Sequence, residues 1–128
     1  MPKPTPDVII YHNPACGTSR NTLAMIREAG IEPRIVEYLK APPERDELAE
    51  IIQKSGLTVR EAIREKSPAY AELKLDNPKL SADKLLDAMV ANPELINRPF
   101  VVTPQGMRLC RPAERVKEIL PGGSRSER

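Results

Sequence analysis

Short apolar runs at 8–11 and 35–38 flank a stretch whose apolar residues recur at helical spacing. These residues are Leu23, Ile26 and Ala29. We expect this helix to begin at Cys16 or Gly17 and to end at Gly30, because glycine favours the left-handed backbone that closes helices. Strand, helix and strand in this order predict a βαβ unit with parallel strands and a right-handed crossover.

The pattern becomes helical throughout from about 42 to 97. Thr58 and Glu61 have the spacing of a capping box, which predicts a helix that carries Arg64 on its exposed surface. Ser81 is expected to cap an amphipathic helix. Its predicted inward residues are Ala82, Leu85, Leu86, Met89 and Val90.

Strand-like residues return at 100–102 and at 107–110, joined by a four-residue turn at 103–106. So short a connection predicts an antiparallel hairpin. Pro112 suits the first turn of a last helix. The inward residues of that helix are predicted to be Val116, Ile119 and Leu120.

The element order is therefore β-α-β, a helical block, then β-β-α. Without the block this is the order of the thioredoxin fold, so we expect an α/β protein with a thioredoxin-like mixed sheet and an inserted all-helical subdomain. The chain is expected to form a single domain of residues 1–128. Its parts are a core at 8–41 and 98–120, an insertion at 42–97, and loose ends at 1–7 and 121–128.

Composition narrows the function classes. The 128 residues are 40% hydrophobic and 30% charged, as in ordinary globular chains, and the net charge of +2 gives no reason to expect a nucleic-acid partner. The sequence has no run of about 18 apolar residues, so no membrane span is expected. Residues 1–7 lack the apolar region of a signal peptide, so we expect a cytoplasmic protein. No large unexplained apolar face is evident, which favours a monomer.

Cysteine and histidine are scarce. Two cysteines and one histidine, with no Cys-x-x-Cys pair, favour neither a disulfide framework nor a structural zinc site. Cys110 lies in the predicted return strand, where we expect a buried and inert thiol.

Cys16 stands at a helix start, in front of the small or polar residues Gly17, Thr18 and Ser19. Unpaired N–H groups and partial positive charge at such a position bind anions and favour a thiolate. The segment thus predicts a nucleophile beside an oxyanion cradle. A small buried cysteine is the alternative interpretation. His12 would stabilise the thiolate if protonated, although a single loop histidine is more often structural.

Three segments carry a resemblance to a known family. His12-Asn13-Pro14-Ala15-Cys16-Gly17-Thr18-Ser19-Arg20-Asn21-Thr22 is the first, Ile96-Asn97-Arg98-Pro99 the second, and Thr103-Pro104-Gln105-Gly106-Met107-Arg108-Leu109-Cys110-Arg111-Pro112 the third. Together they closely resemble the glutaredoxin-linked bacterial arsenate reductases, over about residues 8–120. The longer C-terminal tail of that family is shortened here.

The resemblance implies particular roles. The nucleophile would be Cys16, and the histidine that lowers its pKa would be His12. Three arginines would hold the oxyanion, namely Arg64, Arg98 and Arg111, and the helix start would add Gly17, Thr18 and Ser19. Asn13 and Pro99, the latter in a cis peptide, would be structural neighbours of the site.

The resemblance also implies the reaction. Cys16 would attack arsenate, glutathione would attack the arsenic, and glutaredoxin would take the glutathione, giving arsenite for arsenic detoxification. No tightly bound cofactor is implied, with glutathione a co-substrate. Ser19 stands where a thioredoxin has its second cysteine, which fits a mechanism that uses outside thiols.

Two alternatives stay open at this point. A thioredoxin-fold redox-sensing transcriptional regulator usually needs a Cys-x-x-Cys switch, and Ser19 removes it. A glutathione-dependent thiol oxidoreductase not specific for arsenate would use the same thiolate. The phosphatase-loop type of arsenate reductase needs an arginine six residues after the cysteine, where this chain has Thr22.

Overall fold

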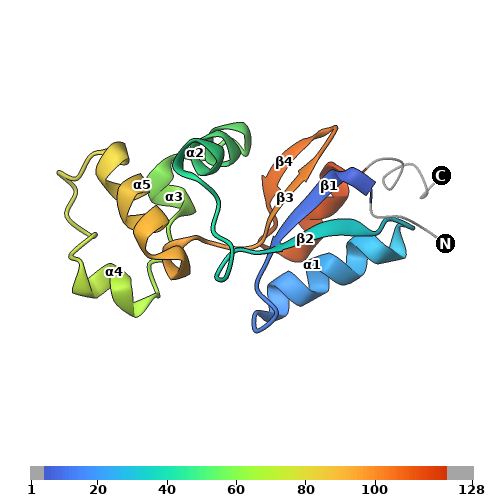
Figure 1. Cartoon of the computed structure of the whole chain (residues 1–128), viewed down its shortest axis with the longest axis horizontal. Coiled ribbons are helices and arrows are strands. Elements are labelled where there is room, and N and C mark those ends of the chain that lie inside the picture. Colours follow the sequence, from blue (N-terminus) through green and yellow to red (C-terminus); the bar gives the residue numbers. More distant parts are fainter. Residues whose placement is uncertain (1–4, 121–128) are drawn as a thin grey trace. The chain divides into compact units, whose positions relative to one another are not determined.

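The computed structural model describes residues 5–120 (Figure 1). The expected loose end at 121–128 lies outside these residues. The chain divides into two compact units, one formed by the chain up to Tyr38 and from Arg98 onward, the other by Leu39–Asn97. That they act as a single domain stays a prediction. The elements are β1 (Thr5–His12), α1 (Gly17–Glu28), β2 (Pro33–Glu37), α2 (Arg45–Lys54), α3 (Val59–Ala62), α4 (Pro68–Glu72), α5 (Ala82–Ala91), η1 (Pro93–Leu95), β3 (Phe100–Thr103), β4 (Gly106–Leu109) and η2 (Ala113–Glu118).

In the described part of the first unit, four strands form one mixed sheet in the order β2-β1-β3-β4. β1 and β2 run parallel, as expected of a βαβ unit. β3 runs antiparallel to β1 and to β4, so the predicted hairpin is confirmed. This is the predicted thioredoxin-like sheet.

The core of this unit lies on one face of the sheet, where α1 and η2 pack together (Figure 1). Alternate residues of β1 point to that face, as the period of a strand requires. The buried cluster contains Val8, Ile10, Leu23, Ile26, Val101, Cys110, Val116, Ile119 and Leu120. The expected Ala29 is instead exposed at the end of α1.

The expectation of a loose arm at 1–7 is wrong from Thr5 onward, because β1 begins there and Thr5 pairs with Pro33 of β2. The register shifts between Thr5 and Ile9, and that irregularity contains Pro6. A bulge is one of the few places where a strand accepts proline, which has no N–H to donate.

Two further boundaries differ from expectation. β2 ends at Glu37, which leaves Tyr38 outside the strand but 1% exposed. The last helix is a 3-10 helix, with Pro112 as its N-cap residue after a cis peptide bond rather than in its first turn. The burial predicted from its apolar spacing is nevertheless confirmed for Val116, Ile119 and Leu120.

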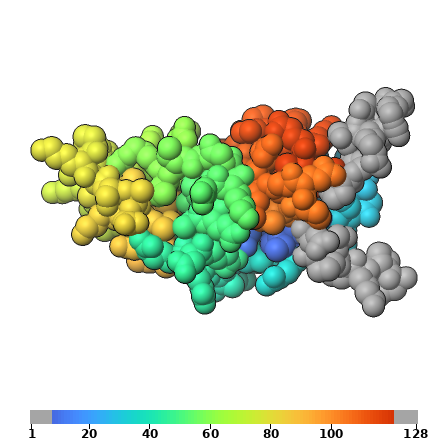
Figure 2. Space-filling model, turned by 90° about the horizontal axis from the view of Figure 1, so that it is seen from above, coloured from blue at the N-terminus to red at the C-terminus, as the bar shows by residue number. Residues whose placement is uncertain are grey.

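The second unit is helical, and its packed surface runs from green to yellow in the space-filling view (Figure 2). Ser81 caps α5 by accepting a hydrogen bond from the Lys84 N–H at 3.2 Å, as predicted. Leu85, Leu86 and Met89 are buried. Ala82 is exposed and Val90 half-buried, so the apolar stripe is narrower than the sequence suggested.

The capping box of Thr58 and Glu61 is present, but α3 ends at Ala62. Ile63 takes an extended conformation and forms an isolated antiparallel bridge with Ile96, and the Arg64 N–H donates to the Leu95 carbonyl at 2.7 Å. Arg64 is therefore half-buried beside a bridge, not on an exposed helix surface. A β-branched residue such as Ile63 fits this pairing better than another helical turn.

Candidate active site

The loop between β1 and α1 is held by its own polar groups. Cys16 is the N-cap residue of α1, and its carbonyl accepts the Arg20 N–H at 3.0 Å, which begins the helix. The Cys16 N–H donates to the Asn13 carbonyl at 3.0 Å, and the Asn13 Oδ1 accepts the Ala15 N–H at 2.9 Å. Asn13 thus fixes the turn that places Cys16 at the helix start.

Ser19 joins three parts of this loop. Its side chain is fully buried, its Oγ accepts the Asn13 N–H at 3.0 Å, and the same oxygen lies 2.7 Å from Nδ1 of His12. One hydroxyl thus links the end of β1, the loop and the first turn of α1. The expected position of a second thiol is occupied by a structural hydrogen-bonding group.

The environment of Cys16 favours its thiolate. Partial burial raises the pKa of the thiol, but the Ser19 N–H, the charge of Arg98, the guanidinium of Arg111 and the Thr18 N–H together hold that pKa below its usual range. The helix start and the arginines therefore stabilise the negative sulfur. Gly17 is exposed and is not among the groups that lower this pKa.

Arg111 is the cation in direct contact with the sulfur. Its Nη1 lies 3.9 Å from Sγ of Cys16 and also donates to the Arg98 carbonyl at 3.1 Å. The peptide bond before Pro99 is cis, as expected, and the Pro99 carbonyl accepts the Cys110 N–H at 2.9 Å. The fold thus brings the strand ends that carry Arg98 and Arg111 to the helix start that carries Cys16.

His12 lies in a buried position at the end of β1. It is 7% exposed, and this burial lowers the pKa of the imidazole despite the opposing charge of Glu37. Arg27 and Arg20 lower it further. Burial therefore disfavours the protonated imidazole, and the role of His12 at the thiol stays a prediction. The contact of its Nδ1 with the Ser19 hydroxyl connects His12 to the loop that carries Cys16.

Two arginines complete the comparison with the sequence prediction. Arg64 belongs to the helical unit, and its role at the thiol stays a prediction. Arg20 was not assigned from the sequence, yet its Nη1 donates to the Pro14 carbonyl at 2.9 Å. The sequence did offer a signal for it. Arg20 lies four residues after Cys16, which places it one helical turn from the N-cap and beside the loop.

We expect Cys16 to be alkylated by iodoacetamide with a rate that levels off at lower pH than for an ordinary thiol, whose pKa is about 8.5. The thiolate is the reactive form, and a lowered pKa populates it at lower pH. Mass spectrometry across a pH series measures this rate. Cys110 is the internal control, because it is 0% exposed and burial raises the pKa of its thiol to about 12. A Cys16 rate that follows a free thiol would contradict the prediction.

No metal centre competes with this site in the part of the chain that the structure describes. Among residues 5–120, no three His, Cys, Asp or Glu side chains are grouped to hold a metal ion. Within the same range, no helix has the length and apolar character needed to cross a bilayer.

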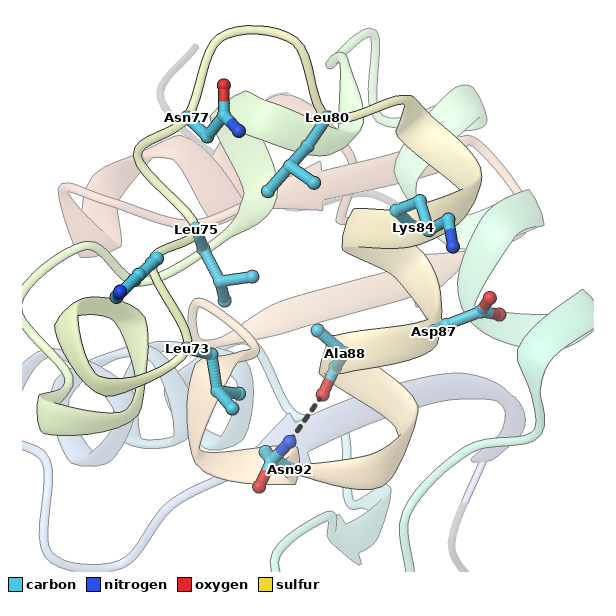
Figure 3. A pocket seen from close by; sticks show the side chains of 9 residues that line it. Leu73, Leu75, Asn77, Leu80, Lys84, Asp87, Ala88 and Asn92 are labelled. Carbon is cyan, nitrogen blue, oxygen red and sulfur yellow. Dashed lines mark hydrogen bonds between the residues drawn. The ribbon is translucent and has the colours of Figure 1, made fainter.

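A hollow of about 510 Å³ lies in the helical unit between α5 and the segment after α4 (Figure 3). Leucine side chains face it, and the Asn92 side chain donates to the Ala88 carbonyl at 3.1 Å. Neither cysteine nor histidine is among its lining residues. We assign no chemistry to it.

The chain also matches a known protein family in sequence and in structure. Residues 11–119 match the sequence model described as the ArsC family. The chain is 68% identical to the arsenate reductase of Rhizobium meliloti (strain 1021) over 114 residues, which are 89% of this chain and 81% of that protein. It is 56% identical to the arsenate reductase of Escherichia coli (strain K12) over 90% of this chain and 82% of that protein.

A solved structure of an arsenate reductase from Vibrio cholerae superposes with a TM-score of 0.85 at 46% identity, covering 88% of this chain and 97% of that one. The residues that match the family model include the loop of Cys16 and the strand ends of Arg98 and Arg111. This chain belongs to the ArsC family.

Proposed function

We propose that the protein reduces arsenate to arsenite, with Cys16 as the nucleophile. The observation that carries the proposal is the contact of 3.9 Å between Sγ of Cys16 and the guanidinium of Arg111, at a thiol whose pKa is lowered. A thiolate beside fixed cations suits attack on a tetrahedral oxyanion. The relatives named arsenate reductases at 56% and 68% identity support the choice of oxyanion.

In the first step, the Cys16 thiolate attacks As(V) and forms a sulfur–arsenic bond. One arsenic–oxygen bond breaks, and that oxygen leaves as hydroxide or water after protonation. The thiolate is needed because a neutral thiol is the poorer nucleophile. Arsenic stays in the oxidation state V in this step, so no electron has yet been transferred.

The remaining oxygens of arsenate carry negative charge that must be offset. We assign this role to Arg64, Arg98 and Arg111, because the planar guanidinium makes paired, charge-assisted hydrogen bonds and stays protonated. The backbone N–H groups at the start of α1, from Gly17, Thr18 and Ser19, add donors to the same charge. The contact of Arg111 with the Arg98 carbonyl holds one of these guanidinium groups beside the sulfur.

Glutathione and glutaredoxin complete the reaction in this proposal. The glutathione thiol attacks the arsenic and displaces a second oxygen as water. The glutaredoxin thiolate then attacks the glutathione sulfur, and the sulfur–arsenic electron pair passes to arsenic, which becomes As(III). Water releases arsenite from Cys16, and the two outside thiols end as a mixed disulfide. We place this chemistry in the cytoplasm, because it needs a reduced thiol pool.

His12 and Ser19 act as positioning residues in this proposal. Nδ1 of His12 lies 2.7 Å from the Ser19 hydroxyl, and Ser19 provides one of the backbone N–H groups that lower the pKa of Cys16. His12 thereby acts on the thiol through the geometry of the helix start. Asn13 and Pro99 support the same loop and strand end.

The two alternatives differ from this proposal in testable ways. A redox-switch regulator needs a second reactive thiol, and Cys110 is fully buried with a raised pKa. A general glutathione-dependent oxidoreductase would need no cations placed for an oxyanion. Arg98 and Arg111 beside the sulfur therefore favour arsenate reduction.

The deciding measurement is oxidation of NADPH coupled through glutathione reductase, glutathione and glutaredoxin, with and without arsenate. We expect oxidation that depends on arsenate and on glutaredoxin. A rate that is independent of arsenate, with a disulfide substrate turned over instead, would favour the general oxidoreductase. The absence of any arsenate-dependent rate would contradict the proposal.

Cys110→Ser should keep most of the arsenate turnover. The Cys110 side chain lies in the core, where its sulfur is 3.8 Å from the Arg108 carbonyl, so a hydroxyl can donate there at a stability cost of about 1 kcal/mol. The coupled assay and a thermal melt measure the two effects. A folded Cys110→Ser protein without turnover would give Cys110 a role in the chemistry.

A further inference from the structure

A groove of about 480 Å³ runs along α1, beside the loop between β1 and α1 that carries Cys16. Its polar lining comes from His12, Arg20, Arg27 and Glu28, and its apolar lining from Pro14, Leu23 and Ala24. This volume is in the range of small-molecule sites. The buried residues of α1 are Ser19, Thr22, Leu23 and Ile26, and the groove lies along the adjoining exposed face, which carries Arg20, Ala24 and Arg27.

We propose that this groove binds glutathione, the co-substrate, and the inference rests on the proposed function. Glutathione is a tripeptide with an amino-acid group at its glutamyl end, a central thiol and a carboxylate at its glycyl end. The groove offers matching charges in the same order. It has an arginine beside a glutamate at one end, Arg27 and Glu28, and an arginine beside the catalytic loop at the other, Arg20.

The spacing fits this assignment. Arg20 and Arg27 are seven residues apart on α1, which places their Cα atoms about 10 Å apart along the axis. In glutathione the glutamyl Cα and the thiol are seven bonds apart, about 8 Å when extended. With the glutamyl end at Arg27 and Glu28, the thiol therefore lies at the Arg20 end of the groove, where the guanidinium of Arg20 donates to the Pro14 carbonyl in the loop that carries Cys16.

Arg20 is held in place for the glycyl carboxylate. Its Nη1 donates to the Pro14 carbonyl at 2.9 Å, and its Nη2 lies 3.8 Å from the position that a Cβ on Gly17 would occupy. The guanidinium thus crosses the open side of the loop. A side chain that is already ordered loses less freedom when it binds.

Arg27 is paired with Glu32, through Nε and Nη2 at 2.9 Å each. The two side chains are 49% and 38% exposed, and exposed pairs of this kind contribute little. A ligand carboxylate can therefore share or replace Glu32 at Arg27. Glu28 on the next residue provides the negative charge that the ammonium group of glutathione requires.

The groove and the proposed arsenate site use different arginines. Arg20 and Arg27 act on the pKa of His12, whereas Arg98 and Arg111 act on the pKa of Cys16. Arsenate on Cys16 and glutathione in the groove then do not compete for the same guanidinium groups.

Binding is tested with S-methylglutathione and the Cys16→Ser protein. The glutathione sulfur is then blocked by the methyl group, and position 16 carries no thiol that could react. We expect backbone amide NMR shifts that cluster on residues 20–28. The Arg27→Gln and Ala24→Trp variants should bind about fivefold more weakly, the first by losing a charge and the second by filling the groove. Arg34→Gln, on the exposed edge of β2, is the matched control and should bind as the parent does.

Glu28→Gln separates glutathione from a simple anion. Loss of this carboxylate removes the partner of the ammonium group and should weaken S-methylglutathione binding about threefold. A site that only attracts anions would instead bind more tightly after the same change. Tighter binding, or amide shifts that cluster away from α1, would overturn the proposal.

Kinetics separate this inference from the proposed function. At saturating arsenate, Arg27→Gln should raise the KM for glutathione about fivefold and leave the KM for arsenate unchanged. If the parent protein shows no arsenate-dependent rate but S-methylglutathione still shifts α1, the proposed function fails and the groove stands. If turnover is normal and the KM for glutathione does not respond to Arg27→Gln or Ala24→Trp, the groove assignment fails alone.

Discussion

The Cys16→Ser protein should lose arsenate turnover by roughly a thousandfold or more. Sulfur provides both the nucleophile and the leaving group in the proposed cycle, and a serine hydroxyl stays protonated at neutral pH. The described contacts around position 16 offer N–H groups and guanidinium groups, which stabilise an anion but accept no proton. The coupled NADPH assay measures the loss.

Arsenate binding should survive this substitution, because Arg98 and Arg111 are unchanged. Calorimetric titration of the Cys16→Ser protein with arsenate checks that expectation and separates binding from chemistry. Cys110→Ser is the matched control, with the same atomic change at a buried thiol. Turnover by Cys16→Ser above about a tenth of the parent rate would mean that another group attacks the arsenic.

The second large effect is expected for Arg111→Ala. This change removes the guanidinium group that lies 3.9 Å from the Cys16 sulfur, so the pKa of Cys16 should rise toward that of an ordinary thiol. It also removes a donor to the bound oxyanion. We expect kcat/KM for arsenate to fall about 10- to 100-fold, the equivalent of about 1.5–3 kcal/mol.

Two measurements resolve these contributions. The pH series of iodoacetamide alkylation reports the pKa of Cys16, and kcat/KM measured well above that pKa reports the loss of oxyanion binding alone. Arg111→Lys should restore part of the thiolate stabilisation, because it keeps the charge, but not the paired hydrogen bonds. Arg34→Ala is the control for loss of a surface arginine. An unchanged alkylation profile with unchanged kcat/KM would remove Arg111 from the site.

The strands and helices that follow local rules could be predicted from the sequence. The apolar spacing of α1, the cap at Ser81 and the short turn before Gly106 each depend on neighbours within a few residues. β1 was predicted too short because its first residues are stabilised by pairing with β2 at Pro33, which is distant in the sequence. Strand ends depend on such partners.

The site could be predicted where residue type alone decides the chemistry. Cys16 was identified from its place at a helix start, whereas the arginines beside Pro99 and Pro112 were assigned from the resemblance to the family. The lowered pKa of His12 could not be predicted, because it depends on how deeply the fold buries the ring. Arg64 was misplaced on a helix because the pairing of Ile63 with Ile96 is a tertiary contact.

Ser19 has a consequence for how the protein stores electrons. The position that could hold a second thiol is fully buried and bonded to His12 and Asn13, and the other cysteine is sealed in the core. Under the proposed chemistry the protein therefore has no internal reservoir of reducing equivalents. Mixed with arsenate alone it should release no arsenite, and its rate in the cell should follow the ratio of reduced to oxidised glutathione.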